Sequence, residues 1–128
     1  MRSLNKAMLM GNLGADPSET TLAKGGAMIS FPLATSREYE HAGEKKKVTD
    51  FHRIVIWGKL GEVAKRYLAK GSAVYLEGRI VNRTFEDQAG DKRFITEIVA
   101  DELNIITWKK GQPPELGVLQ EEVGAVSS

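Results

Sequence analysis

The sequence predicts a mainly β domain: a barrel of five strands in Greek-key order, with one helix between the third and fourth strands. Two observations lead to this fold class. Most of the first 108 residues alternate apolar and polar side chains in short runs, which is typical of half-buried strands. One stretch in the middle of these runs has the period of an amphipathic helix instead.

The first two strands are predicted at residues 4–13 and 27–36. Gly11 within the first run indicates a bulge or a close approach of another backbone. Residues 14–26 contain the turn sequences GADPSE and KGG, so we expect a loop with at most a short extended piece. Pro32 cannot donate a ladder hydrogen bond, and we therefore expect the second strand to lie at an edge or to bend there.

A polar, charged loop is predicted at residues 38–47, followed by the third strand at residues 48–58. The helix comes next, because apolar side chains recur at i, i+3, i+4, i+7 and i+8 from Leu60 to Leu68. Gly71 supplies the left-handed residue that ends it.

The last two strands are predicted at residues 73–85 and 93–108, joined by the turn sequence EDQAGDK. Residues 1–108 therefore form one domain. Residues 109–128 lack periodicity and are expected to form a short flexible C-terminal tail. The element order matches a five-stranded OB-fold barrel, although a swollen β-grasp or another α+β roll has the same element count.

Composition excludes several classes of protein. The 128 residues include no cysteine, which excludes disulfide frameworks, zinc knuckles and thiol nucleophiles. No apolar run approaches the roughly 20 residues that cross a bilayer, and the start lacks a signal-peptide hydrophobic region, so we expect a cytoplasmic protein. The net charge is +1, but residues 1–85 carry 14 Lys and Arg against 8 Asp and Glu. A local positive field can therefore attract a polyanion.

Few residues are suited to catalysis or to metal binding. The only histidines are His41 and His52. His41 lies in the charged loop, and His52 shares the inward face of its strand with two isoleucines, so neither is expected to act as a base. Glu86, Asp87 and Asp91 share one turn and are expected to be solvated. We predict no enzymatic activity, no metal site and no cofactor.

Aromatic and basic side chains share strand faces in this sequence. Phe51, Arg53 and Trp57 fall on one face of the third strand, and Ile54 and Ile56 fall on the other. Single-stranded nucleic acid needs this mixture, because each base offers a π-face and each linkage a charge. The fourth strand repeats it with Arg79, Arg83 and Phe85, whereas core packing or a subunit contact is expected for Phe31, Tyr67 and Tyr75.

Four segments resemble the bacterial single-stranded DNA-binding protein family: NKAMLMGNLGADP, ATSREY, TDFHRIVIWGKLGEVAKRYLAKGSAVYLEGRI and RTFEDQAGDKRFITEIVADEL. They lie in order, with spacings kept, over roughly residues 3–106. The resemblance implies an OB-fold that assembles as a homotetramer and wraps single-stranded DNA without sequence preference. Replication, recombination and repair are the processes implied.

The resemblance also implies roles for individual residues. The expected base-stacking residues are Tyr39, Phe51, Trp57 and Phe85. The cations expected along the DNA path are Lys6, Arg53, Lys59 and Arg83, to which the shared strand face adds Arg79. The side chains expected at subunit interfaces are His52 and Tyr75.

Two features depart from the family. Pro32 stands where a small polar residue is more usual. The family normally ends in a long linker and an acidic tip closing with Ile-Pro-Phe, which recruits other proteins of DNA metabolism. This chain ends QEEVGAVSS, without a terminal aromatic, so recruitment of replication or repair proteins by the tail is not assumed.

Three alternatives stay open. A primosome-type OB protein would bind both DNA and a helicase partner. An OB-type subunit would turn its aromatic face to another protein, and Arg53 and Arg83 would then find carboxylate partners. An RNA-directed role is equally compatible with the residues, because stacking and phosphate contacts do not read the 2′-hydroxyl.

Overall fold

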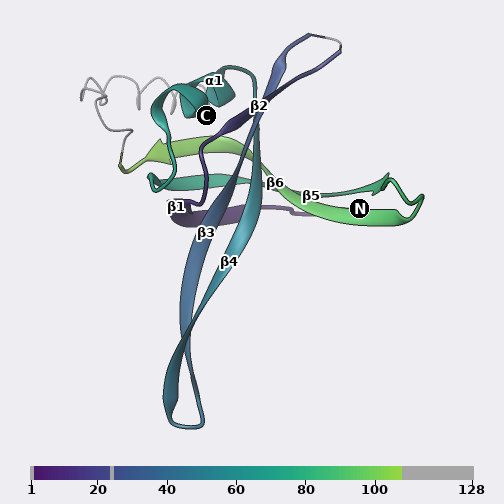
Figure 1. Cartoon of the computed structure of the whole chain (residues 1–128). Coiled ribbons are helices and arrows are strands. Elements are labelled where there is room, and N and C mark those ends of the chain that lie inside the picture. The colour runs from purple at the N-terminus through teal and green to yellow at the C-terminus, as the bar shows by residue number, and fades with distance from the viewer. Residues whose placement is uncertain (1, 24, 108–128) are drawn as a thin grey trace.

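The computed structural model describes residues 2–23 and 25–107, so Trp108 and the predicted tail at residues 109–128 lie outside the described residues. The described chain forms a closed five-stranded barrel with one short additional strand and one helix (Figure 1). In chain order the elements are β1 (Ala7–Leu13), β2 (Ser18–Thr21), β3 (Ala27–His41), β4 (Glu44–Trp57), α1 (Gly58–Tyr67), β5 (Ala73–Glu86) and β6 (Lys92–Ile105). This confirms the predicted OB-fold barrel, and β2 is the short extended piece expected in the first loop.

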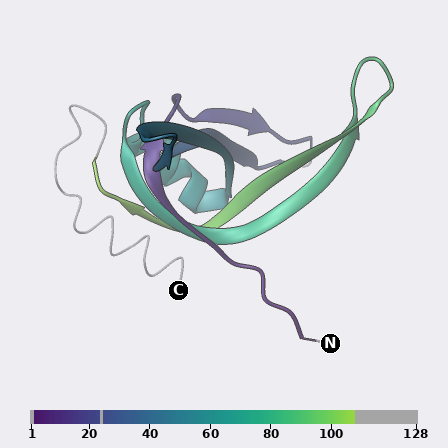
Figure 2. The same ribbon diagram turned by 90° about the horizontal axis from the view of Figure 1, so that it is seen from below.

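The barrel closes because β1 pairs with two different strands. The strands lie in the order β1-β5-β6-β4-β3, and β3 then pairs with β1 through Leu13 and Leu33. Neighbouring strands are antiparallel except β4 and β6, which run parallel. In Figure 2 the strands curve into a ring, and β2 lies on the outer side of β3.

Aliphatic side chains fill the barrel, and α1 adds its apolar face to them. Leu33, Ile54 and Ile56 are fully buried, and Leu60 and Ala64 of the helix join the same core. Phe31 and Tyr67 are also buried, as predicted. No helix in residues 2–23 and 25–107 is long and apolar enough to span a membrane.

A tight turn joins β4 to α1 and leaves Trp57 at the surface. Gly58 follows with φ +66°, a left-handed conformation that glycine adopts without steric strain. The chain can therefore change direction within one residue. Trp57 keeps an extended backbone and an exposed ring at the end of the strand.

β3 lies inside the sheet and is not an edge strand, but it lacks a ladder partner on one side at Pro32 itself. β3 pairs with β4 along its length, and Pro32 lies opposite Arg53. On the other side, β2 pairs with β3 up to Ser30 and β1 pairs with it from Leu33, which leaves a gap at the proline. The Pro32 carbonyl accepts a hydrogen bond from the Gly14 N–H at 2.8 Å across this gap. Proline has no N–H to donate on this side of the strand, and the gap means that no regular ladder hydrogen bond is required there.

The predicted loop at residues 38–47 is instead the end of a long hairpin. β3 and β4 continue to a two-residue turn, Ala42-Gly43, whose φ angles of 53° and 80° suit a turn between twisted strands. Oppositely charged residues face one another across the ladder; for example, Glu38 lies opposite Lys47. This segment has no apolar period because both of its faces are in solvent.

Glycines allow close crossings at two points in the barrel. A Cβ on Gly11 would lie 2.2 Å from the Ala34 carbonyl oxygen, which confirms the expected close approach. A Cβ on Gly78 would lie 2.2 Å from the Val99 carbonyl oxygen, and the β5–β6 register shifts between Glu77 and Gly78. This second site is a β-bulge that the alternation of side chains did not predict.

Candidate nucleic-acid interface

The outward face of β4 carries aromatic and basic side chains at the barrel surface. Phe51 is 65% exposed and Trp57 is 44% exposed, with the half-buried Arg53 between them. Ile54 and Ile56, on the opposite face of the same strand, are fully buried in the barrel. The strand therefore has one face in the core and one face that carries exposed aromatic rings and a half-buried arginine.

β6 and β5 extend this outward face across the barrel. Arg53 pairs with Glu97 in β6, and Glu97 pairs in turn with Val81 in β5. Residues paired in a ladder point to the same side of the sheet. The residues on this outward face, here called the basic strip, are Phe51, Arg53, Val55, Trp57, Arg79, Val81, Arg83, Glu97 and Val99, of which Val55, Glu97 and Val99 are buried. A hollow of about 460 Å³ opens over most of these residues.

Glu97 joins two arginines in the middle of the basic strip. Arg53 Nε donates to Glu97 Oε2 at 2.6 Å, Arg83 Nε donates to Oε1 at 3.0 Å, and Arg83 Nη2 donates to Oε2 at 3.2 Å. The hydrogen bond from Arg83, reinforced by Arg53, lowers the pKa of the Glu97 carboxyl, so it is ionised at neutral pH. The three side chains together carry a net charge of +1.

This ion cluster bears on the alternative in which the aromatic face meets a protein. Arg53 and Arg83 do find a carboxylate partner, as that alternative expects, but the carboxylate belongs to the same chain. A single carboxylate serves both guanidinium groups, whose side chains remain 39% and 49% exposed. Positive charge therefore remains available to a phosphate.

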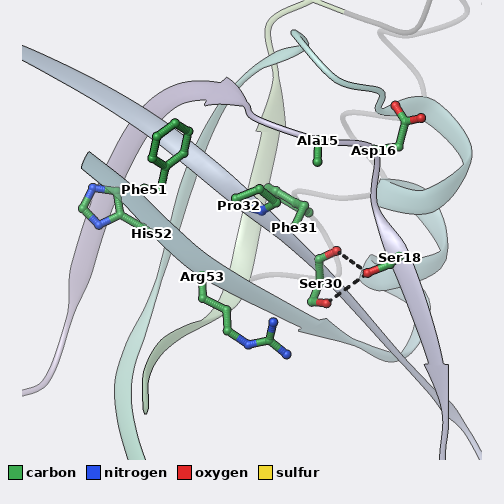
Figure 3. Close-up of a pocket in the computed structure, with 9 residues that line it drawn as sticks. All are labelled: Ala15, Asp16, Ser18, Ser30, Phe31, Pro32, Phe51, His52 and Arg53. Carbon is green, nitrogen blue, oxygen red and sulfur yellow. Dashed lines mark hydrogen bonds between the residues drawn. The ribbon is translucent and has the colours of Figure 1, made fainter. Parts of the chain in front are cut away.

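A second hollow, of about 570 Å³, lies beside Phe51 (Figure 3). The Phe51 ring and Pro32 lie on one side of it, and the Arg53 side chain extends along another. The Ser18 hydroxyl hydrogen-bonds to the Ser30 carbonyl at 3.3 Å on the side away from Phe51. An aromatic surface next to polar groups and a cation suits a flat, polar ring attached to a phosphate.

Lys59 and Arg79 lie together at the other end of the basic strip. With Trp57 they line a third hollow of about 360 Å³, which also contacts Asp101. Lys59 is exposed in the first turn of α1, directly after the strand that carries Trp57. The structure thus brings two predicted phosphate-binding cations next to a predicted stacking ring.

The other two predicted stacking residues lie on hairpins that extend from the barrel (Figure 1). Tyr39 is exposed on the β3–β4 hairpin, opposite Lys46. Phe85 is exposed on the β5–β6 hairpin, opposite Arg93. Each ring has a cation across the ladder, but neither belongs to the basic strip.

Two residues near this surface were not predicted from the sequence. Phe94 is 81% exposed and pairs with Thr84, so it faces away from Phe85 on the same hairpin. Its signal in the sequence is an aromatic residue directly after Arg93 in the predicted last strand. Glu97 was missed as well, and the signal for it is a lone charge within the apolar run ITEIVA.

Lys6 and Tyr75 lie in a different group of charges. Lys6 Nζ forms an ion pair with Glu77 Oε1 at 2.7 Å, and the Tyr75 hydroxyl donates to Glu77 Oε2 at 2.5 Å. Glu102 is paired with Glu77 in the β5–β6 ladder. We call these four residues the acidic cluster, because two carboxylates share one lysine. Lys6, predicted to lie on the DNA path, is therefore already paired with a carboxylate.

The pKa values in the acidic cluster follow from these contacts. Glu77 lies so close to Glu102 that its charge raises the pKa of the Glu102 carboxyl. The hydrogen bond from Lys6 lowers the pKa of Glu77, and the hydrogen bond to Glu77 raises the pKa of Tyr75 to about 12. The ionised form of Glu77 is thus stabilised, and the ionised form of Glu102 is destabilised.

The remaining predicted interface residue, His52, is half-buried and points toward the barrel side of β4. Its Nε2 lies 2.8 Å from Thr35 Oγ1, within hydrogen-bonding distance. Among the described residues no three His, Asp or Glu side chains gather in a way that could hold a metal ion. Met8 and Met10 are 62% and 65% exposed on β1, and Met10 pairs with Tyr75.

The fold and this surface can now be compared with known proteins. The model of the single-strand binding protein family matches residues 4–106. The chain belongs to the single-strand binding protein family. A relative from Chlorobaculum tepidum, named single-stranded DNA-binding protein 1, is 43% identical over 107 residues, which are 82% of this chain and 66% of the relative. The chain thus spans slightly less than two thirds of that relative's length.

A solved structure supports the same family membership. The Plasmodium falciparum SSB complex with ssDNA is 32% identical to this chain and superposes with a TM-score of 0.76. The superposition covers 84% of this chain and 98% of the Plasmodium chain. The barrel described above is therefore the OB-fold of this family.

Proposed function

We propose that this protein binds single-stranded DNA without sequence preference and protects it during replication, recombination and repair. The observation that carries the proposal is the basic strip, an exposed surface of rings and cations on the barrel of a family member. We prefer this function to the primosome-type alternative because the family match extends over residues 4–106.

Binding would combine stacking with charge neutralisation. Base–aromatic stacking contributes about 1–3 kcal/mol per base and is indifferent to sequence, which suits Phe51 and Trp57 on the barrel. Tyr39 and Phe85 would stack further bases along the two hairpins. The proposed phosphate contacts are Arg53, Lys59, Arg79 and Arg83. Paired bases cannot open onto these rings, so the protein should prefer single strands to duplex.

The protein would act as a homotetramer and as a binding protein rather than an enzyme. The exposed Met8 and Met10 beside Tyr75 support a subunit contact, because large apolar side chains in one outward patch favour burial against another copy. Residues 1–108 would be the DNA-binding domain and residues 109–128 a separate tail. We place the protein in the cytoplasm, on the nucleoid, because its proposed ligand is there.

A fluorescence titration tests the proposed function. Tryptophan emission is followed while a thymidine homopolymer is added at low and at high salt, with a matched duplex as the control. We expect quenching by the single strand, weaker at high salt, and little response to the duplex. The variant Trp57→Phe separates the Trp57 signal from that of Trp108. An absence of binding to the single strand at low salt would contradict the proposal.

A further inference from the structure

Glu97 is the only buried charged side chain among the described residues, with 5% of its surface exposed. Burial of a carboxylate is unfavourable unless cations and hydrogen bonds compensate it. Its position is also unexpected, because a carboxylate in a surface that binds a polyanion should weaken the binding. Both observations require a reason for Glu97 at this place.

We propose that Glu97 is a positioning residue for single-stranded DNA, which holds Arg53 and Arg83 side by side with their free donors available to phosphates. This inference rests on the proposed function and deepens it. Glu97 orients the two arginine side chains and contributes to the salt dependence of DNA binding.

The strand order supports this role. β6 lies between β4 and β5, so Glu97 is placed between an arginine from each neighbouring strand. A guanidinium group has five N–H donors in a fixed plane. Arg53 uses one of them on Glu97 and Arg83 uses two. Four donors of Arg53 and three of Arg83 have no hydrogen-bond partner among the described residues.

Fixed arginines bind with a smaller loss of entropy. Each free arginine side chain would have to be ordered when it contacts a phosphate, which opposes association. Glu97 orders both side chains before DNA arrives. In exchange, its negative charge offsets one of the two positive charges, so the DNA meets a net charge of +1 rather than +2.

The substitution Glu97→Gln separates these two effects. Affinity for a thymidine homopolymer is measured over a range of salt and extrapolated to 1 M. Loss of the carboxylate charge should steepen the slope of log affinity against log salt by up to about 0.7, the value for one neutralised phosphate on a single strand. Loss of orientation should lower the extrapolated affinity, by about 2- to 12-fold for each arginine released.

Two results would overturn the inference. A slope equal to that of the wild type would mean that the DNA does not sense the Glu97 charge. A higher affinity at 1 M salt would mean that Glu97 obstructs the arginines instead of positioning them. Glu62→Gln is the matched control, since it removes the charge of an exposed carboxylate on α1 and should leave the slope unchanged.

A second variant tests the inference if Glu97→Gln does not fold. Arg83→Lys keeps the charge but loses the planar, two-point contact with Glu97. It should keep the wild-type slope and bind at least about twofold more weakly at every salt concentration. Binding equal to that of the wild type would overturn the positioning role. If the wild-type protein itself does not bind the homopolymer, the proposed function fails, which is a different result from any of these.

Discussion

The basic strip and the acidic cluster both include residues of β5 and β6 but have opposite charge. In the strip, Glu97 lies between Arg53 and Arg83, and with Arg79 the net charge is +2. In the acidic cluster, Glu77 and Glu102 share Lys6, and the net charge is −1. Neighbouring arginines lower the pKa of Glu97, whereas a neighbouring carboxylate raises the pKa of Glu102. The arrangement of charges on the surface, rather than the overall charge of +1, therefore favours the basic strip as the proposed site for a polyanion.

The β-bulge at Gly78 lies between the two regions. Glu77 pairs with Glu102 on one side of the bulge, and Arg79 pairs with Val99 on the other, so the two residues belong to different groups on one strand. DNA should depend on side chains on the Arg79 side of the bulge and should be insensitive to those on the Glu77 side.

The largest expected effect is the loss of both rings of the strip. The double substitution Phe51→Ala and Trp57→Ala should weaken binding by about 2–6 kcal/mol, because each ring contributes about 1–3 kcal/mol per stacked base. A competition assay with a fluorescently labelled short oligonucleotide measures this. Leu4→Ala removes an exposed side chain two residues before Lys6 of the acidic cluster and should change affinity by less than about 0.5 kcal/mol. Equal losses in both variants would end the distinction between the two regions.

The next effect concerns the bulge and is a change in stability. Gly78→Ala should lower the free energy of unfolding by about 1–3 kcal/mol or more, because its Cβ would meet backbone atoms of Val99 and Ala100. Urea denaturation followed by circular dichroism measures it. An unchanged midpoint would show that the backbone accommodates a side chain there and that the close crossing is not required.

A smaller effect distinguishes the cations of the two regions. Arg79→Gln should reduce the salt slope by about 0.7, the amount for one phosphate contact on a single strand. Lys6→Gln should leave the slope unchanged, because Glu77 already neutralises Lys6 at 2.7 Å. The family resemblance places Lys6 on the DNA path instead. A reduction by Lys6→Gln equal to that by Arg79→Gln would support the resemblance and extend the path across the bulge.

The smallest effect is the pH dependence of stability. Glu97 has a lowered pKa in the folded protein, so its stabilisation is present above the unfolded value of about 4.3 and is lost as the pH falls through the folded value. Glu102 has a raised pKa, so its ionised carboxylate lowers the stability of the folded protein at neutral pH. This loss of stability is relieved as the pH falls through the pKa of Glu102 in the folded protein. Thermal melts between pH 7 and pH 4 should show that Glu102→Gln stabilises at neutral pH only. A stabilisation that persists at pH 4 would contradict this explanation.

Local patterns predicted the fold and part of the binding surface. The alternation of Phe51 and Trp57 with Ile54 and Ile56 was sufficient to assign the two faces of β4, because a strand in a small barrel has one face in the core. The charged end of the β3–β4 hairpin was missed because neither of its faces is buried. The sequence could not show that Pro32 lies at a gap between β1 and β2 rather than in an edge strand, because that gap depends on pairing with distant segments.

The charge contacts could not be predicted, because they join residues far apart in the sequence. Arg53 meets Glu97 across 44 positions, and only the parallel pairing of β4 and β6 brings them together. Lys6 meets Glu77 for a similar reason, through the pairing of β1 with β5. The family resemblance and the shared strand faces suggested cations on a DNA path but not the carboxylates that pair with them.

Hydroxyl-radical footprinting of side chains, with and without a thymidine homopolymer, tests the central claim most directly. Oxidation of Phe51 and Trp57 is compared with oxidation of Leu4, an exposed side chain two residues before Lys6 of the acidic cluster. We expect DNA to protect the two rings and to leave the oxidation of Leu4 unchanged. Protection of Leu4 without protection of the rings would contradict the central claim, because the DNA would then lie on the side of the acidic cluster.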